Sequence, residues 1–453
     1  MIKHAISSAV LILLLGLPAV AAETGQSLSL SDAIARALAS NPELAVDEPA
    51  RQAARLEARA SRATYLPRVD FEQAYTGGDN PVYVFGTLLT QRAFTIGNFS
   101  LPSLNNPSPI DNLQTRFTVQ QNVWDFGRSR SRTRAAQLGV EIADQTHEDK
   151  KKLTILAVLD AYYSLSLSTE ASESARIALE SAEAIERQAK ARVGSGLTTE
   201  ADLLRGQAYL AAAKQRHLQA LGMVEIARAN LNRLMGDPLD AHPGATAPLK
   251  PAKFPAPPEA ELLADLRERR PDLQRVIAEL QQAEAEVGVR KSEFIPQIGA
   301  YGAWEADNPS LSNAGGTNWL AGISLRWNIY AGGADDARLQ AARQRLEQKK
   351  RQVAAAESAM ALEIRRALIE CRSAEQQVDV TLAAEAQSQE SLRILKNRYD
   401  AGLATMTDLL AAETERSAAR TALADAIYRH RLGIARVEFA AGLLSSTSQA
   451  TKP

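Results

Sequence analysis

The chain of 453 residues contains one segment twice: RVGSGLTTEADLL at residues 192–204 returns as RYDAGLATMTDLL at residues 398–410. The shared glycine and leucine positions lie 206 residues apart, as from 196 to 402. The same offset relates three further residues, Asn122, Gly127 and Gly236, to Asn328, Gly333 and Gly442. A constant offset over such a stretch indicates an internal duplication.

Earlier landmarks repeat at an offset of 229 residues, as from Pro42 to Pro271. NPEL at 41–44 matches RPDL at 270–273, and YLP at 65–67 matches FIP at 294–296. The extra length of the first copy therefore falls between residues 67 and 122. We predict a first repeat at 23–236, a proline-rich linker at 237–259, a second repeat at 260–443 and a C-terminal tail at 444–453.

Residues 1–22 have the features of a secretory signal peptide. Lys3 precedes an apolar stretch, and Ala19-Val20-Ala21 supplies small residues for cleavage. Beyond this segment, no run of about 18 apolar residues predicts a transmembrane helix. Any membrane crossing must therefore use β-strands.

Each repeat has the pattern helix, strand, loop, strand, long helix, turn and helix. Apolar and polar residues alternate from residue 67 onward, over 113–124 and over 318–329, as in an outer-membrane barrel strand. We expect external loops at 76–112 and 305–317. Apolar residues in the longer loop could fold inward and partly plug a channel mouth. All four tryptophans, Trp124, Trp304, Trp319 and Trp327, lie in or beside these strands. They suit a membrane-interface aromatic belt, although Trp also simply favours strands.

Long helices are predicted at 128–192 and 334–400, because proline is absent from both and only Gly139 interrupts the first. Shorter helices are expected at 31–65 and 197–236. Small and apolar residues recur at alternating spacings of three and four, as in a coiled-coil seam. The seam positions are Ala171, Ala175, Ala178, Ala182, Ile185 and Ala189 in the first copy, and run from Ile364 through Cys371 to Tyr399 in the second. We interpret Cys371, the single cysteine, as a packing residue.

The composition argues against several classes of function. A net charge of -1 gives no reason to expect a nucleic-acid partner. The five histidines show no metal-ligand spacing, and no phosphate-binding glycine loop is present. We therefore expect a protein that is not an enzyme and has no cofactor.

Together, these motifs resemble the TolC-type outer-membrane efflux proteins, also called outer membrane factors. The resemblance rests on the helix start at 28–44, the strand starts at 65–67 and 294–296, the strand ends at 123–128 and 329–333, and the two repeated segments at the helix turns. It implies a mainly α fold with a β-barrel section. Three copies would form a 12-stranded barrel in the Gram-negative outer membrane, continued by a coiled-coil α-barrel across the periplasm.

The resemblance also implies a role and partners. The chain would be the duct of a tripartite efflux or type I secretion system, working with outer-membrane lipid, a periplasmic adapter (membrane fusion protein) and an inner-membrane pump of the RND, ABC or MFS type. The exported substrate and the pump class cannot be inferred from the sequence. The alternative is an exported, non-porous coiled-coil scaffold of the cell envelope, which would explain the seams but not the strands.

Two sets of site residues follow from the resemblance. A periplasmic gate would use Asp202, Tyr399 and Asp408, with Ala404 and Ala411 standing where further gate residues would be expected. Asp202 and Asp408 could equally be charges favoured at helix N-termini. The turns would dock the adapter through Val193, Gly194, Gly196 and Leu197 and through Ala401, Gly402 and Leu403, although their glycines are needed first to turn the chain.

Overall fold

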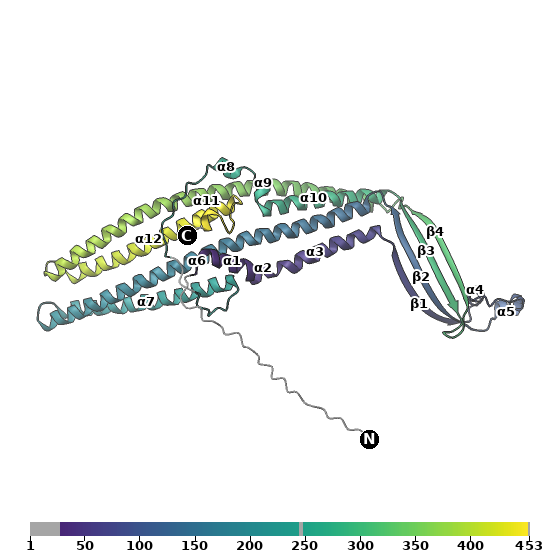
Figure 1. Cartoon of the computed structure of the whole chain (residues 1–453), viewed down its shortest axis with the longest axis horizontal. Coiled ribbons are helices and arrows are strands. Elements are labelled where there is room, and N and C mark those ends of the chain that lie inside the picture. Colours follow the sequence, from purple (N-terminus) through teal and green to yellow (C-terminus); the bar gives the residue numbers. More distant parts are fainter. Residues whose placement is uncertain (1–27, 244–247, 452–453) are drawn as a thin grey trace, which may run out of the picture.

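The computed structural model describes residues 28–243 and 248–451; the predicted signal peptide lies outside these residues. The chain is elongated, with strands at one end and two helical hairpins at the other (Figure 1). The first half contains α1 (Leu30–Ser40), α2 (Pro42–Ala45), α3 (Asp47–Ser61), η1 (Arg62–Tyr65), β1 (Arg68–Gly78), α4 (Pro81–Thr90), η2 (Ile96–Phe99), α5 (Leu101–Asn105), β2 (Ile110–Trp124), α6 (Arg128–Gly194) and α7 (Glu200–Met235). The second half contains α8 (Glu259–Leu263), α9 (Leu266–Arg269), α10 (Pro271–Lys291), η3 (Ser292–Phe294), β3 (Gln297–Asn308), β4 (Gly316–Arg326), α11 (Ala334–Asp400), α12 (Met406–Ala440) and η4 (Gln449–Thr451).

The two longest helices, α6 and α11, have 67 residues each, as the absence of proline predicts. At about 1.5 Å per residue each spans about 100 Å. Each begins directly after a glycine in the left-handed region, Gly127 with φ 90° and Gly333 with φ 80°. A residue with a Cβ would be strained there, so glycine allows the chain to pass directly into the long helix.

The prediction of one continuous helix over 31–65 is wrong. The helix breaks at Asn41, whose backbone is extended and whose side chain accepts hydrogen bonds from Glu43 N and Leu44 N at the start of α2. Pro42 explains the break, because it has no N–H to donate and it disfavours a helical conformation in the residue before it. Further on, α3 passes into the 3₁₀ turn η1.

The two halves make the same contact at the residue before their matching prolines, Pro42 at the start of α2 and Pro271 at the start of α10. Asn41 Nδ2 donates to Leu234 O at 2.8 Å, and Arg270 Nη1 donates to Ala440 O at 2.7 Å. Both acceptors are at the C-terminal end of the last helix of their half. Two residues further, Gly236 lies so close to Ser40 that a Cβ would come within 2.2 Å of the Ser40 carbonyl oxygen. Glycine thus permits the chain to close on itself.

The largest hydrophobic core lies near the middle of the long axis, where α1, α6, α7, α11 and α12 meet. The predicted seam positions on α11, including Ile364 and Ala374, are buried or half-buried, which confirms the seam. Cys371 is buried and free, and burial raises the pKa of its thiol to about 11. It also lies against Gly433, where the two helices approach closely. These findings support the packing role inferred for this cysteine.

The four strands form one antiparallel sheet in the order β1-β2-β3-β4, so that β1 and β4 are its edges. The strands are longer than predicted: β1 runs to Gly78, β2 starts at Ile110, and β3 and β4 reach into the segment expected to be a loop at 305–317. The remaining segment at 79–109, called the insert below, contains α4 and α5. The loop predicted at 76–112 is therefore shorter and partly helical.

Candidate functional site: the faces of the sheet and the helix tips

One face of the sheet is apolar and exposed. In register across the strands are Val69, Val119, Gly302 and Ala321, and the next row contains Phe71, Phe117, Trp304 and Trp319. Three of these rings are in contact, with centroids 5.1 Å apart for Phe71 and Phe117 and 5.9 Å apart for Phe117 and Trp304. Trp319, at the edge, is 79% exposed. Such a face is unfavourable in water and suits contact with hydrocarbon.

A second group of aromatic residues lies at the helical end of the same face. Trp124 packs against Phe126 with centroids 5.8 Å apart, and Trp327 donates from Nε1 to Phe294 O at 3.1 Å. Trp319 and Trp327 are eight positions apart in the chain, which corresponds to about 25 Å in extended backbone. This spacing fits an apolar band flanked by two aromatic belts. The assignment of all four tryptophans to a membrane interface stays a prediction.

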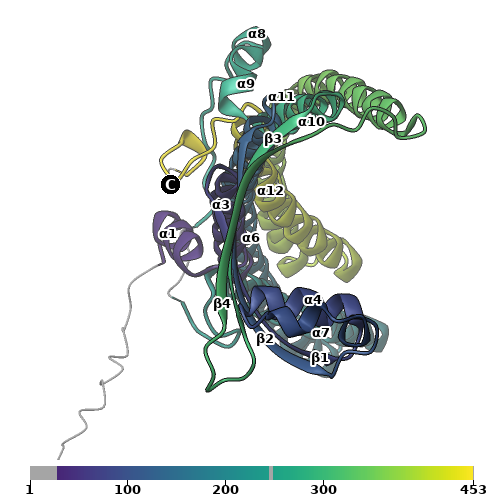
Figure 2. The same cartoon turned by 90° about the vertical axis from the view of Figure 1, so that its right-hand side faces the viewer.

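The opposite face of the sheet is polar. Arg116 donates from Nη2 to Glu305 Oε2 at 3.0 Å, across the β2–β3 pair. Tyr301 lies over Gly322, where a Cβ would come within 2.7 Å of its hydroxyl oxygen. Figure 2 shows that the sheet is curved and that α4 lies on its concave side. Since α4 bonds to residues of the polar face, described below, the concave side is the polar one.

The tips of the helical hairpins are tight turns closed by glycine. In the first hairpin, α6–α7, Gly196 has φ 71°, and Leu197 N donates to Arg192 O at 2.8 Å. In the second hairpin, α11–α12, Gly402 has φ 75°, and Leu403 N donates to Arg398 O at 2.7 Å. This pattern ends helices without exposing their last carbonyls.

Both tips carry an exposed leucine: Leu197 is 73% and Leu403 is 69% exposed. Among the other residues predicted to dock a partner, Val193 and Gly194 belong to the last turn of α6, while Ala401 follows α11 directly. The turns thus need their glycines for geometry, whereas nothing in the fold requires the two leucines to be apolar.

The two predicted gate carboxylates bond within their own helix starts. Asp202 accepts from the hydroxyls of Thr198 and Thr199 at 2.8 and 3.0 Å, and Asp408 accepts from Thr405 N and Oγ1 at 2.9 and 2.7 Å. The hydrogen bonds from the threonines hold the pKa of both carboxyls below the ordinary value. Within the described part of the chain, neither carboxylate bonds to Tyr399. Their placement at helix N-termini agrees with the second interpretation given above.

Tyr399 lies between the two hairpins and is 5% exposed. It packs in a small cluster with residues such as Ile185 and Leu409, and within the described part of the chain its hydroxyl has no hydrogen-bond partner. Arg192 stacks on its ring at 4.8 Å and donates to the carbonyl oxygens of Tyr399 and Asp400 at 3.0 and 3.3 Å. Arg192 begins the first copy of the repeated segment, but no sequence pattern indicated a role for it.

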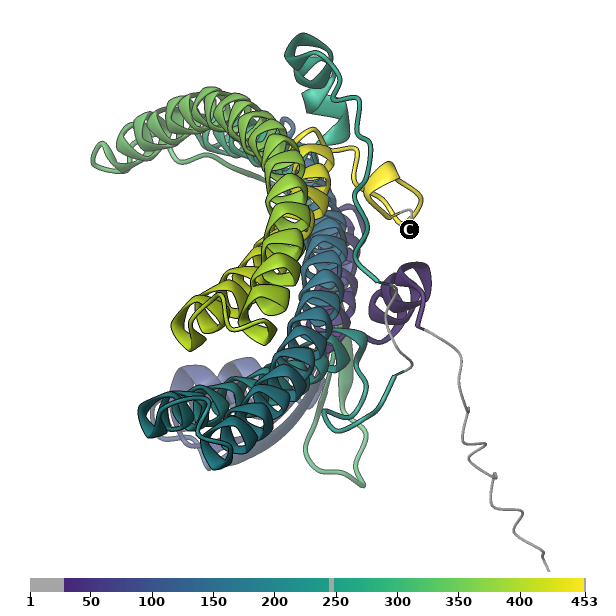
Figure 3. The same cartoon turned by 90° about the vertical axis from the view of Figure 1, so that its left-hand side faces the viewer.

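Arg192 belongs to a series of polar contacts that join α6 to the second hairpin. Tyr428 donates to Asp160 at 2.5 Å, Arg420 lies 3.6 Å from Glu170, Ser181 donates to Glu413, and Gln188 donates to Asp400 at 2.8 Å. The partners Tyr428, Arg420 and Glu413 lie on α12, where residue numbers fall as they rise along α6, as expected for antiparallel helices. Asp400, and Tyr399 beside it, are at the end of α11. We call these four contacts and that of Arg192 the inter-hairpin contacts. They reach the tips, where the two hairpins lie beside each other at one end of the molecule (Figure 3).

Glu413 is the most enclosed member of the inter-hairpin contacts, with 5% of its surface exposed. One carboxylate oxygen accepts from Ser181, and Arg416 lies 3.9 Å from the other. A buried carboxylate that loses its partner is costly, so this contact resists separation of the hairpins more than a surface pair would.

Among the described residues, no group of three or more His, Cys, Asp or Glu side chains is placed to hold a metal ion. Within residues 28–243 and 248–451, no helix is both long and apolar enough to cross a bilayer.

Comparison with known proteins identifies the family. The profile of the outer membrane efflux protein family matches residues 33–237 and 262–442, and the chain belongs to this family. It is therefore an outer-membrane channel protein that extends into the periplasm. The structure is similar to the Campylobacter jejuni CmeC outer membrane channel, with a TM-score of 0.81 at 18% identity over 99% of this chain and 96% of that one. It is also similar to VceC from Vibrio cholerae, with a TM-score of 0.76 at 18% identity, over 91% of this chain and 96% of that one.

Two curated relatives are similar in sequence. Protein CyaE of Bordetella pertussis is 27% identical over 67% of this chain, and the match spans 65% of CyaE, just under two thirds of its length. The alkaline protease secretion protein AprF of Pseudomonas aeruginosa is 23% identical over 93% of this chain and 86% of its own length.

Proposed function

We propose that three copies of this chain form the duct of a tripartite export system, together with a periplasmic adapter and an inner-membrane pump. The observation that carries the proposal is the sheet, which has one polar and one exposed apolar face and two unpaired edges. Unpaired backbone groups are prohibitive in lipid, and four strands are too few to close a barrel. Pairing β4 of each copy with β1 of the next removes all edges and turns every polar face toward one lumen.

The oligomer can be tested directly. The protein extracted in detergent should have the mass of a trimer and should form pores in planar bilayers. A monomer that makes no pores would contradict the proposal. The family assignment favours the channel over the scaffold, and fractionation separates the two, since a scaffold would be released from cells without detergent.

The two hairpins of each copy form the periplasmic gate in this proposal. Tyr399 and Arg192 supply the contact between them, while Asp202 and Asp408 shape the helix starts and place negative charge at the periplasmic end. Tyr399→Ala removes the ring on which Arg192 stacks, whereas Asp202→Ala removes the charge and threonine bonds of a helix start, so the first variant should raise conductance more than the second. If the Asp408→Asn channel keeps the cation selectivity of the parent, Asp408 contributes no acidic ring.

The exposed leucines at the tips are proposed to contact the adapter. Replacing Leu197 and Leu403 by Asp should abolish export and co-purification of the adapter, while trimers still form. Leu311, in the short loop between β3 and β4, is similarly exposed and offers a matched control, since Leu311→Asp should not affect the adapter. Normal export by the double variant would refute docking at the tips.

A polypeptide substrate is favoured over a small one by the relative AprF, whose name assigns it to alkaline protease secretion. Deleting the gene should then remove one or more proteins from the culture medium without changing drug or metal tolerance. Altered tolerance with an unchanged set of secreted proteins would favour small-molecule efflux.

A further inference from the structure

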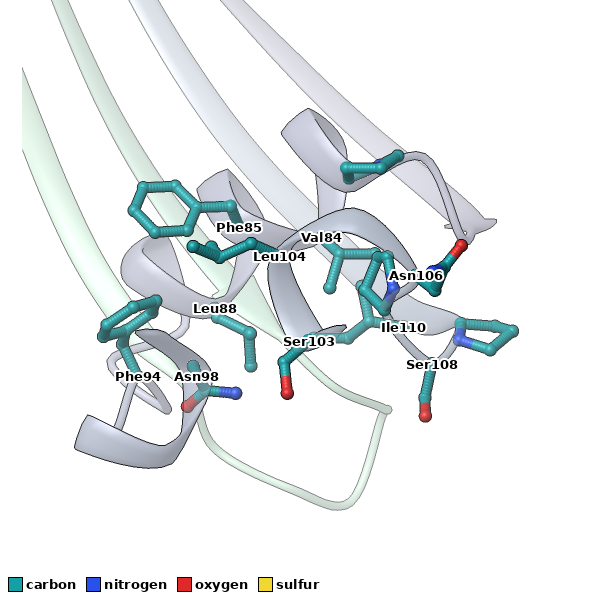
Figure 4. A pocket seen from close by; sticks show the side chains of 13 residues that line it. Val84, Phe85, Leu88, Phe94, Asn98, Ser103, Leu104, Asn106, Ser108 and Ile110 are labelled. Carbon is teal, nitrogen blue, oxygen red and sulfur yellow. The ribbon is translucent and has the colours of Figure 1, made fainter. Parts of the chain in front are cut away.

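The insert between β1 and β2 is a folded unit. Asn80 caps the start of α4 through its side chain, and Pro81 occupies the first turn. Phe85, Phe94 and Phe99 pack edge to face, with centroids 5.0 to 6.4 Å apart. Figure 4 shows further apolar side chains, among them Val84, Leu88 and Leu104, around a cavity of about 310 Å³ within the insert. A segment with caps and its own apolar cluster holds a defined position.

The helix α4 crosses the end of the sheet from one edge to the other. Near its start, Tyr83 donates from its hydroxyl to Thr76 O of β1 at 2.7 Å. At its end, Gln91 donates to Asp111 O of β2 at 2.7 Å, and Arg92 donates to Thr317 O of β4 at 2.9 Å. Contacts to both edge strands fix the helix across the strand ends.

A buried polar cluster anchors the C-terminal end of α4. Gln91 donates to Asn112 Oδ1 at 3.0 Å, and Asn112 donates to Asp307 Oδ1 of β3 at 2.7 Å. Asp307 is 1% exposed and also accepts from Gln114 at 3.2 Å. A buried carboxylate depends on such donors, so freeing α4 would expose or orphan groups that are now satisfied.

The same contacts show on which side of the sheet α4 lies. Arg116 and Glu305 are a pair on the polar face. The pair two positions away is Gln114 and Asp307, and Asn112 lies two positions further along β2. Because every second residue of a strand faces the same side, all of these side chains belong to the polar face. Figure 2 agrees, because α4 lies on the concave side of the sheet. In the trimer proposed above, this face lines the lumen, and the strand ends that carry α4 are those farthest from the helices (Figure 1).

We propose that the insert is a fixed constriction of the outer mouth, held across the lumen by α4 and narrowing the exit at the end opposite the periplasmic gate. This inference rests on the proposed trimeric duct. Because α4 is bonded to both edge strands, the constriction limits the size of what passes the mouth even when the periplasmic gate is open. It also restricts entry from outside, so it can be probed without opening that gate.

The test places a cysteine on the polar face below the insert, as Thr118→Cys in a Cys371→Ala background. Intact cells are treated with a small, charged methanethiosulfonate or with a maleimide carrying a long polyethylene-glycol chain. Replacing residues 81–109 by a short Gly-Ser turn should speed labelling by the large reagent about tenfold or more, and labelling by the small one less than about threefold, since only the large one is limited by the pore diameter. Equal rates for the large reagent with and without the insert, whether fast or slow, would overturn the proposal.

One control separates this proposal from the proposed duct. Ser310→Cys, in the exposed loop between β3 and β4, should react equally in all variants and reports surface display. If the small reagent labels Ser310→Cys but never Thr118→Cys, the polar face lines no open lumen and the duct itself is refuted.

A milder variant tests the anchor. Replacing Gln91 and Arg92 by Ala removes the bonds to β2 and β4 and should also speed labelling by the large reagent. Asn98→Ala is the matched control, because Asn98 bonds only to Thr95 within the insert and its loss should leave the rate unchanged. A Gln91/Arg92 variant indistinguishable from Asn98→Ala would show that these bonds do not hold the constriction.

Discussion

Replacing Arg192 by Ala should shift the channel toward the open state. Arg192 is the residue that joins the two hairpins nearest to their tips, through two carbonyl oxygens and one aromatic ring of the second hairpin. Alanine removes all three contacts and introduces no new charge. The helix should persist, because alanine is the best helix former.

The magnitude follows from these contacts. Hydrogen bonds from a charged group contribute about 1.5–3 kcal/mol when buried, but Arg192 is half-exposed, so we take about 0.8 kcal/mol for each of the two. A cation–π contact at a partly exposed site adds about 0.5 kcal/mol. The loss is therefore about 2 kcal/mol per copy, or about 30-fold. Three copies give about 6 kcal/mol, slightly more than the roughly 5.5 kcal/mol between 1% and 99% open.

The assay is single-channel recording of reconstituted trimers. The parent protein should dwell in a low-conductance state, and Arg192→Ala should dwell mainly in a higher one. Arg187→Ala serves as the matched control, because Arg187 is exposed on the same helix and pairs only with Glu183, 3.9 Å away. If Arg192→Ala changes the open fraction no more than Arg187→Ala does, the contact with Tyr399 does not hold the gate.

Three further predictions concern the sheet and the stability of the helices. Ala321→Arg, in the middle of the apolar face, should lower the stability of the membrane-inserted barrel by about 2–4 kcal/mol and reduce the yield of inserted trimer. Thr118→Arg on the polar face should be tolerated, and equal yields of the two variants would contradict the assignment of faces. Burial holds the pKa of His430 below its ordinary value, so the fold should lose stability as the pH falls below about 6.5, and His430→Gln should remove this loss in melting curves at pH 7.5 and 5. Burial alone would raise the pKa of Asp272, but the hydrogen bonds and charge of Arg270 lower it, so its contribution to stability should decline as the pH falls below about 4. Asp272→Asn should therefore be less stable than the parent at pH 7, and the difference should shrink as the pH is lowered toward 3.

The helices and strands could be predicted where one local rule decides. The range predicted for α11, 334–400, is the observed one, because no helix breaker lies inside it and a glycine precedes it. The prediction of a loop over the insert failed for the opposite reason. Its glycines and prolines suggested a loop, although Asn80-Pro81 before an apolar run is a recognisable helix start. The bonds that fix α4 to the strands join residues far apart in the sequence, such as Arg92 and Thr317, and no local pattern indicates them.

The candidate gate also combines a feature that a local sequence pattern reveals with one that no local pattern reveals. A threonine followed three positions later by an acidic residue, as in Thr405 and Asp408, is a helix-start signature that the sequence alone reveals. The contact of Arg192 with Tyr399 depends instead on the relative position of two hairpins whose tips lie about 200 residues apart in the chain. The 3-4 spacing could therefore place Tyr399 in the seam, but only a family resemblance could assign it to the gate, and no sequence pattern indicated a role for Arg192.

The positions of the inter-hairpin contacts on α6 explain why such long helices need them. The seam residues Ala171, Ala178 and Ala182 are small and alike, so sliding α6 by one heptad would bury almost the same apolar surface. The polar residues Glu170 and Ser181 each stand one position before a seam residue and so occupy the adjacent stripe of the helix. A slip of one heptad would leave the apolar seam filled. It would, however, separate Glu170 and Ser181 from their partners, and the buried carboxylate of Glu413 would lose the hydrogen bond from Ser181. The apolar seam thus supplies attraction between helices, whereas the polar contacts of α6 with the second hairpin select one register.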